Sequence, residues 1–284
     1  MSFCAAVARR EENIVVDKHH PPLLQRTTGE KIRAVPRSAL WLIGAMVWTL
    51  LFGTIGIIIA LFLPYYRRYW FFLQWSFGLL WWTRVACGIR YEIEGEENIP
   101  DEPCVVMCKH QSAWETLAPQ YWFNPQTWVL KKELLKVPMV GWALGMLSPI
   151  AIDRSARKEA MQQMLDQGRA RLADGRWIIV YPEGTRIPAG YSGKYRRGGA
   201  VLAWETGTPV VPVAHNAGEL WPRNSLLKYP GVIRVRIGKP MQPTAPSADA
   251  FLEEVREWIE SNTRELSQVY EQPAASAGVE TGRK

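Results

Sequence analysis

A histidine and a glutamate lie five residues apart, just after an apolar run that predicts a buried strand. The run covers residues 104–107, and the segment after it contains His110 and Glu115. α/β folds place functional groups at such strand ends. If His110 lies in the loop and Glu115 in the first turn of the next helix, the carboxylate can hold one imidazole nitrogen and leave the other free as a general base. Taken alone, the spacing favours a structural hydrogen-bonded pair.

A second block offers charge at a predicted helix start. Asp153, Arg154 and Ser155 follow the apolar run 150–152 and precede a helical pattern. The free N–H groups of a helix N-terminus could bind an anion together with the Arg154 guanidinium. Taken alone, the block favours a simpler interpretation, in which Asp153 or Ser155 caps the helix and Arg154 is a surface charge.

A third block brings a carboxylate and a guanidinium to another strand end. It follows the apolar run 177–181, and Gly184 permits a tight turn that would present Glu183 and Arg186 together. A guanidinium suits bidentate contact with a phosphate. Lys194 begins a basic stretch shortly afterwards, which forms either a second wall of an anion pocket or a solvated loop.

A strand pattern at residues 210–214 is preceded by Pro209 and interrupted by Pro212. Proline cannot donate a hydrogen bond to a sheet ladder, so the pattern predicts an edge strand or a bulge. His215 comes next and is interpreted as a structural residue or one on a polar rim.

The spacing of Cys104, Cys108 and His110 suggests a metal site. Strand alternation places both cysteines on one face, where buried packing explains them. A zinc site would need a fourth ligand, and the sequence offers no evident one. We therefore expect no metal ion.

Residues 84–272 alternate strand and helix patterns in the way that is typical of one α/β domain. Several strand patterns are continuous apolar runs, which predicts a mostly parallel central sheet flanked by helices. The expected strands cover residues 91–95, 104–107, 127–130, 177–181, 210–214 and 232–237, and helices are expected at 155–173 and 249–268. The small polar residues 273–284 predict a disordered tail.

A hydrophobic anchor of residues 39–83 precedes this domain. Residues 39–63 carry no charge, and a helix rising about 1.5 Å per residue could there cross a hydrocarbon core of roughly 30 Å. Residues 69–82 are aromatic but too short to span, which suits an interfacial segment. Either the long helix spans the membrane, or both segments form a hairpin in one leaflet.

Residues 1–38 are basic and are expected to form a flexible tail. Removal of residues 1–83 should then leave a soluble domain.

The overall composition excludes several classes of protein. Hydrophobic residues make up 48% and charged residues 21%, which excludes a disordered chain. Four cysteines are too few for a disulfide scaffold and favour a reducing compartment. The net charge is +7, but the basic residues are scattered without a recognition motif, so no nucleic-acid partner is expected.

Taken in order, the blocks resemble the lysophosphatidate acyltransferase family, the PlsC-type glycerolipid acyltransferases. The resemblance covers about residues 85–240. The four blocks are His110 to Glu115, Ile152-Asp153-Arg154, Glu183-Gly184-Thr185-Arg186 and Val211-Pro212-Val213. Their shared order is far more specific than any single block. The first block usually ends in aspartate in this family, so Glu115 adds a methylene to the pair.

The resemblance implies an enzyme that transfers a fatty acyl group from acyl-CoA or acyl-carrier protein to the sn-2 hydroxyl of 1-acyl-sn-glycerol-3-phosphate, giving phosphatidic acid. His110 would be the base and Glu115 would orient it, with no covalent intermediate and no cofactor. Arg154, Arg186 and Lys194 would hold the substrate phosphate.

Four further residues would position the substrate by this resemblance: Glu183, Gly184, Thr185 and Pro212. Glu183 would do so by holding Arg186 or by contacting the glycerol.

The implied partners are a membrane lipid substrate and an anionic membrane surface. We expect the inner (cytoplasmic) membrane, with the catalytic domain facing the cytoplasm. The same blocks would suit another lyso-lipid acceptor, such as a lyso-ornithine lipid or a lysophospholipid. A non-catalytic membrane-anchored lipid-binding protein is the remaining alternative, and retention of His110 and Glu115 argues against it.

Overall fold

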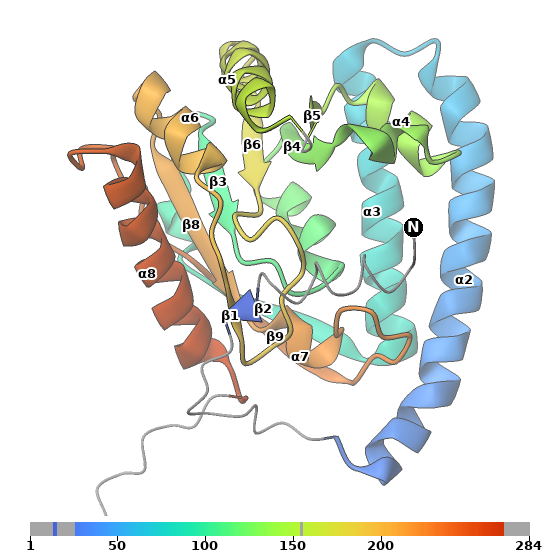
Figure 1. Ribbon diagram of the computed structural model, residues 1–284. Helices are drawn as coiled ribbons and strands as arrows, with labels where there is room; N and C mark the ends of the chain where they lie inside the picture. The colour runs from blue at the N-terminus through green and yellow to red at the C-terminus, as the bar shows by residue number, and fades with distance from the viewer. Residues whose placement is uncertain (1–13, 16–25, 154–155, 270–284) are drawn as a thin grey trace, which may run out of the picture.

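A seven-stranded mixed sheet forms the centre of the molecule (Figure 1). The computed structural model describes residues 14–15, 26–153 and 156–269. The strand order is β2-β9-β8-β3-β6-β4-β5, and every neighbouring pair is parallel except β8 with β9. The strands are β2 (Ile89–Glu94), β3 (Val105–Cys108), β4 (Gln126–Lys131), β5 (Ile150–Ile152), β6 (Trp177–Val180), β8 (Val210–His215) and β9 (Gly231–Ile237). The predicted mostly parallel α/β fold is confirmed, and the short strand β5 is an addition to the predicted set.

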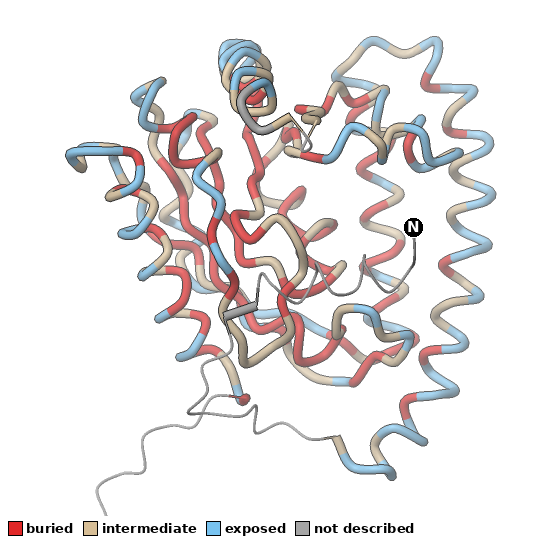
Figure 2. Tube along the Cα trace, viewed as in Figure 1, coloured by how far each residue is buried: buried red, intermediate tan, exposed pale blue. Residues whose placement is uncertain are grey.

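Helices cover both faces of this sheet, as the continuous apolar strands require. Val105 and Met107 of β3 face α5 (Arg157–Ala173), α6 (Gly198–Thr206) and α8 (Ala248–Leu266). Val106 and Cys108 face the opposite way, toward α3 (Tyr65–Cys87). Figure 2 shows the resulting buried strands between exposed helix surfaces.

Short elements complete the described chain. A two-stranded ladder joins β1 (Ile14–Val15) to β7 (Ser192–Gly193). The remaining helices are η1 (Glu96–Asn98), η2 (Trp114–Thr116), η3 (Ala118–Tyr121), η4 (Lys132–Lys136), α4 (Val140–Met146) and α7 (Ala217–Leu220). Residues 273–284, where a disordered tail is predicted, lie outside the described residues.

The first long helix starts earlier than predicted. α2 covers Thr28–Ala60, so the end of the predicted tail 1–38 is helical and the helix does not begin at residue 39. The cause is a capping box: Thr27 Oγ1 accepts from the Glu30 backbone N–H, and Glu30 accepts from the Thr27 backbone N–H. The helix continues through Pro36.

The aromatic segment is longer than predicted, since α3 runs from Tyr65 to Cys87 and ends at Gly88, whose φ of +70° permits a left-handed cap. α2 and α3 form a hairpin that lies beside the sheet domain (Figure 1). α2 is long and apolar enough to cross a membrane.

The hairpin contacts the domain near both of its ends. At one end, the rings of Trp41 and Trp221 meet edge to face with centroids 4.8 Å apart. At the other, Tyr65 donates its hydroxyl to the Leu147 carbonyl at 3.4 Å, and the Met139 side chain lies against Gly53. One side of α2 is thereby fixed to the protein, and its other side exposes apolar side chains.

The prediction of an edge strand around Pro212 is wrong. β8 lies inside the sheet, between β3 and β9. The ladder with β9 runs from Val213 to His215 and resumes only as an isolated bridge at Val210, so Pro212 lies in an irregular gap. The missing N–H therefore interrupts no regular ladder, which is the bulge alternative.

Candidate active site

His110 and Glu115 follow the end of β3, at the carboxyl edge of parallel strands. β3 stops at Cys108, and the chain passes through a loop into η2, which contains Glu115. The expected helix is only a single 3₁₀ turn. This short turn brings the glutamate back beneath the loop.

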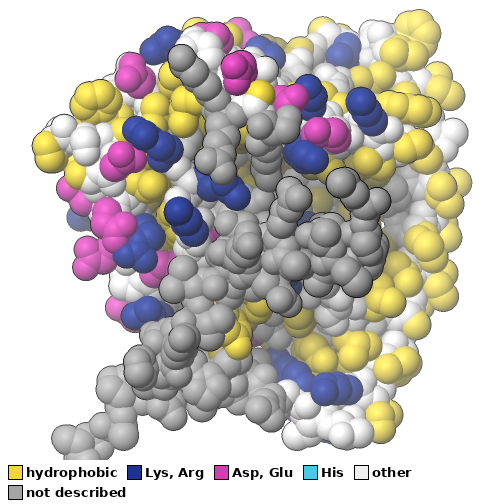
Figure 3. All heavy atoms as spheres, in the orientation of Figure 1, with side chains coloured by type: hydrophobic (Ala, Val, Ile, Leu, Met, Phe, Trp, Pro, Cys, Tyr) yellow, Lys and Arg dark blue, Asp and Glu magenta, His cyan; other side chains and the backbone are white. Residues whose placement is uncertain are grey.

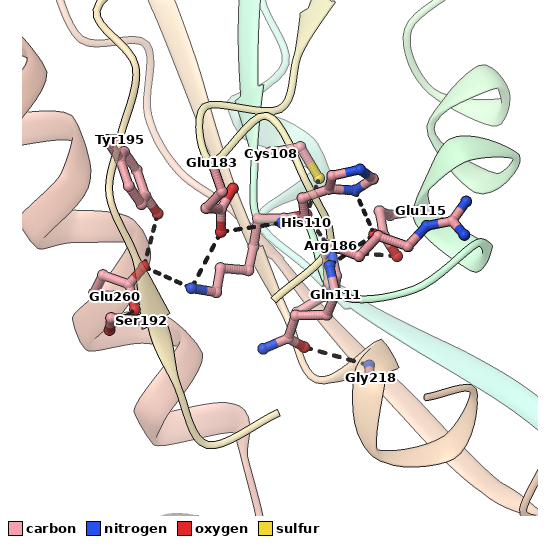
Figure 4. Close-up of polar contacts among 12 residues, drawn as sticks. Cys108, His110, Gln111, Glu115, Glu183, Arg186, Ser192, Tyr195, Gly218 and Glu260 are labelled. Carbon is pink, nitrogen blue, oxygen red and sulfur yellow. Dashed lines mark hydrogen bonds and ion pairs between the residues drawn. The ribbon is translucent and has the colours of Figure 1, made fainter. Parts of the chain in front are cut away.

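One oxygen of Glu115 holds the loop together (Figure 4). Its Oε1 is 2.9 Å from His110 Nδ1, 2.8 Å from the Gln111 backbone nitrogen and 2.7 Å from the Ser112 backbone nitrogen. Burial would raise the pKa of Glu115, but the hydrogen bonds from His110 and from the Ser112 backbone hold the pKa below its ordinary value. An ionised Glu115 requires the His110 proton on Nδ1, which leaves Nε2 as the acceptor.

A stacking contact also holds the face of the His110 imidazole. The rings of His110 and Tyr181 stack with centroids 4.4 Å apart and planes 22° apart. Tyr181 in turn donates its hydroxyl to the Glu115 carbonyl oxygen at 2.7 Å. The His110 side chain is 14% exposed, whereas the Glu115 side chain is fully buried. His110 is therefore accessible from solvent and Glu115 is not.

Glu183 points inward, contrary to the expectation that it holds Arg186 or reaches the substrate. Gly184, with φ +66°, closes the turn after β6, and its N–H donates to the Tyr181 carbonyl at 2.9 Å. The fully buried Glu183 accepts from the His110 backbone N–H at 3.3 Å. Burial raises the pKa of Glu183, and Lys109 counteracts that rise. The turn therefore fixes the backbone of the base.

The three cations expected to bind the phosphate differ in where they lie. Arg186 is half-buried, and Figure 4 shows it on the same side of the loop as His110 and Glu115. Lys194 is exposed on the chain after β7. Arg154 lies outside the described residues.

Of the two capping residues that the simpler interpretation of the second block expects, Ser155 lies outside the described residues. The N-cap of α5 is Ala156, without a side-chain cap bond, and Asp153 pairs with Lys132. Thr185 is half-buried beside Gly184.

His215 is a structural residue, as predicted. Its ring is buried, Nδ1 accepts from the Ala217 N–H at 3.2 Å, and Nε2 lies 2.8 Å from the Lys109 carbonyl oxygen. These partners assign the proton to Nε2 and a neutral ring. Burial lowers the pKa of His215, which agrees with that state.

The described residues contain no group of three or more His, Cys, Asp and Glu side chains arranged to hold a metal ion. Cys104 and Cys108 are buried free thiols. Burial raises the pKa of Cys104 to about 12, so this cysteine behaves as packing.

Comparison with known proteins decides the family. The Acyltransferase family profile matches residues 90–216. A 1-acyl-sn-glycerol-3-phosphate acyltransferase of Pseudomonas aeruginosa is 47% identical over 247 residues, which cover 86% of this chain and 95% of that protein. This chain belongs to the 1-acyl-sn-glycerol-3-phosphate acyltransferase family. A yeast (Saccharomyces cerevisiae) protein of that name is 29% identical over 64% of this chain and 63% of its own.

The fold of this acyltransferase also matches a solved structure. The crystal structure of the 1-acyl-sn-glycerophosphate (LPA) acyltransferase PlsC from Thermotoga maritima aligns with a TM-score of 0.69 and 24% identity. The alignment covers 86% of this chain and all of that one.

Sequence reasoning missed one part of this acyltransferase site, a buried ionic cluster behind His110. Lys109 is fully buried, with Nζ 2.6 Å from Glu260 Oε1 and 3.2 Å from Glu183 Oε1. The sequence signal was weak: a lysine beside the histidine, and a glutamate directly after Ile259 on the apolar side of α8. Neither residue indicates its partner, which lies 151 positions away.

Proposed function

We propose that this acyltransferase transfers a fatty acyl group from acyl-CoA or acyl-carrier protein to the sn-2 hydroxyl of 1-acyl-sn-glycerol-3-phosphate, giving phosphatidic acid, with His110 as general base. The observation that carries the proposal is the His110–Glu115 contact of 2.9 Å between a reachable imidazole and a buried carboxylate. The names of the relatives support the acceptor.

In this mechanism His110 Nε2 takes the proton of the acceptor hydroxyl while its oxygen attacks the thioester carbonyl. Glu115 stabilises the imidazolium that forms, as the carboxylate does in a catalytic triad. Collapse of the tetrahedral intermediate forms the ester and breaks the C–S bond. The departing thiolate takes the proton from His110, so the base is restored without an acyl-enzyme, a metal or a cofactor.

Phosphate binding is assigned to three cations of the sequence blocks. Arg186 is the first candidate because it lies on the side of His110 and Glu115 (Figure 4). Arg154 and Lys194 complete the proposed set. Gly184 and Thr185 would set the direction of Arg186 through the turn.

Pro212 would shape the floor of the site from β8. It pairs with Met107 of β3, one residue before Cys108 and two before the loop that carries His110.

The α2–α3 hairpin supports a position within one leaflet. α2 contacts the domain near Trp41 and again near Gly53, so a spanning helix would draw the attached domain into the hydrocarbon. Charged side chains at the bilayer centre are costly. We assign the hairpin to the inner (cytoplasmic) membrane with the catalytic domain on the cytoplasmic side.

The surface beside the hairpin fits such a leaflet. α4, which packs against α2, exposes Val140 and Trp142, and the preceding segment exposes Val137 next to Lys136. Apolar and aromatic side chains beside lysine are typical of a membrane interface. Figure 3 shows apolar side chains gathered along the hairpin side of the molecule.

An acyl-transfer assay on membranes tests the function. Wild-type protein, 1-acyl-glycerol-3-phosphate and labelled acyl-CoA or acyl-carrier protein should yield phosphatidic acid, and His110→Ala should lower the rate by at least about 10²-fold, the lower range for a general base. Full activity of His110→Ala would contradict the base role. If no product forms with either donor, the acceptor would be another lyso-lipid, and the same assay can be run with such acceptors.

A further inference from the structure

The buried ionic cluster connects the last described helix to the catalytic loop. Glu260 of α8 lies 2.6 Å from Lys109 Nζ and accepts from Tyr195 Oη at 2.9 Å and from Ser192 Oγ at 2.6 Å. Lys109 also contacts Glu183, which accepts from the His110 backbone N–H. Figure 4 shows the cluster on one side of His110 and Glu115 on the other.

Among the described residues, the buried Lys109 ammonium faces two carboxylates, those of Glu183 and Glu260. A buried charge is stable only when it is paired and hydrogen-bonded. Glu260 accepts three hydrogen bonds, from Lys109, Ser192 and Tyr195, which hold its carboxylate beside the cation.

Glu260 therefore affects which hydrogen bonds Glu183 makes. Lys109 Nζ is closer to Glu260, at 2.6 Å, than to Glu183, at 3.2 Å. Glu183 can thus share Oε1 with the His110 N–H. Without the charge of Glu260, the ammonium would move onto Glu183 and draw its carboxylate away from that N–H.

We propose that Glu260 is a positioning residue for acyl transfer, which acts through Lys109 and Glu183 to fix the backbone of His110 and hence the direction of its imidazole. None of the four sequence blocks contains Glu260 or lies on its helix. The inference rests on the base role proposed for His110.

Glu260→Gln tests the proposal because it keeps the shape and one acceptor but removes the charge. Since a misplacement of about 1 Å can cost about 10²-fold, we expect kcat to fall by at least about tenfold, with the KM for both substrates within about twofold. Glu257→Gln, exposed on the same helix, is the matched control and should keep wild-type kcat. A lower Tm with unchanged kcat would show a structural role only and overturn the proposal.

A double-mutant cycle tests the route through Lys109. In a Lys109→Met background, Glu260→Gln should change kcat little further, whereas additive losses would overturn the route. If Lys109→Met fails to fold, Ser192→Ala and Tyr195→Phe replace it, since each removes one hydrogen bond to Glu260. Both must lower kcat without raising KM, and an unchanged kcat in both would overturn the proposal.

The same assays separate this inference from the proposed function. An inactive His110→Ala beside a fully active Glu260→Gln would leave the function standing and remove the role of Glu260. An active His110→Ala would remove the base role itself.

Discussion

A single carboxylate oxygen organises the catalytic loop. Glu115 Oε1 accepts from the imidazole and from two successive backbone N–H groups, of Gln111 and Ser112. The longer side chain of glutamate, where the family usually has aspartate, starts from a 3₁₀ turn rather than a full helix. The extra methylene is thus accommodated by the local backbone, and the imidazole contact is kept.

Two replacements of Glu115 should separate the effect of its charge on activity from the effect of its side-chain length. Glu115→Gln keeps the length but removes the anion that stabilises the imidazolium, so we expect kcat to fall by about 10²-fold or more. Glu115→Asp should lose activity as well, because a shorter chain from the same turn cannot reach Nδ1 and both N–H groups. Steady-state acyl transfer measures both variants, and wild-type rates in Glu115→Gln would refute the dyad.

Glu115 should also make stability depend on pH. Its pKa is lower in the folded chain than the ordinary 4.5, so its contribution to stability is complete above about pH 4.5 and is lost as the pH falls through the folded-state value. We expect the difference in unfolding free energy between wild type and Glu115→Gln to be constant near neutral pH and to change below about pH 4.5. Denaturant titrations in detergent measure it, and a difference that is flat down to about pH 3 contradicts the assignment.

Single residues also show what sequence can and cannot predict. His110, Glu115 and Arg186 can be proposed as site residues from the sequence because their motifs are local and stand at strand ends. The inward direction of Glu183 and the pairing of Lys109 with Glu260 depend on how α8 docks, which no local pattern contains. Lys109 was visible beside the histidine, but only the fold shows that its ammonium is buried.

At the level of elements, α3 belongs to the fold as much as to the anchor. Its residues Leu79 and Leu80 are buried in the same core as Val106 and Val211 of the sheet. Removal of residues 1–83 would therefore uncover one face of the sheet. For this reason we expect the truncated domain to aggregate rather than to remain soluble, since such a large exposed apolar patch favours aggregation.

Substitutions within α3 should report this double role. Leu79→Ala should lower the unfolding free energy by about 2–5 kcal/mol, as a large-to-small change in a core does. Val85→Ala, at an exposed position of the same helix, should stay within about 0.5 kcal/mol. Thermal unfolding in detergent compares the two, and equal losses would mean that α3 does not pack on the sheet.

The outer side of α2 should bind lipid without contributing to the fold. Ile55 and Ile58 are exposed, so aspartate at both positions should reduce vesicle binding at an unchanged Tm in detergent. Trp204→Ser on α6, which covers the opposite face of the sheet, is the control and should bind as wild type. Vesicle flotation measures the effect, and undiminished binding of the Ile55→Asp/Ile58→Asp variant contradicts the proposed lipid-facing side.

Element boundaries explain the remaining errors of prediction. Most strands follow from apolar runs, but β5 is only three residues long and has little pattern of its own. The start of α2 depends on the Thr27–Glu30 capping box rather than on hydrophobicity. The missing N–H of Pro212 left an edge strand and a bulge as alternatives, and only the fold shows an internal strand that tolerates the proline where the ladder is irregular.

Across the whole molecule, the hairpin and the loop that carries His110 are joined through the packing of the sheet. α3 packs beneath the sheet that carries His110, and α2 packs on α3 and on the domain. If the hairpin lies in one leaflet as proposed, its depth would set the height of His110 above the lipid. Acceptor and donor would approach from different sides of that plane, the lipid laterally and the thioester from water.

The contact of α2 with the domain near both ends has a kinetic consequence. An enzyme held flat on one leaflet meets its acceptor by diffusion in two dimensions, so the relevant concentration is the number of acceptor molecules per unit area. At a fixed bulk amount of lysophosphatidate, dilution with inert lipid in the same vesicles should lower the rate in proportion to the surface mole fraction. Addition of more vesicles of unchanged composition, once all enzyme is bound, should leave the rate per enzyme constant.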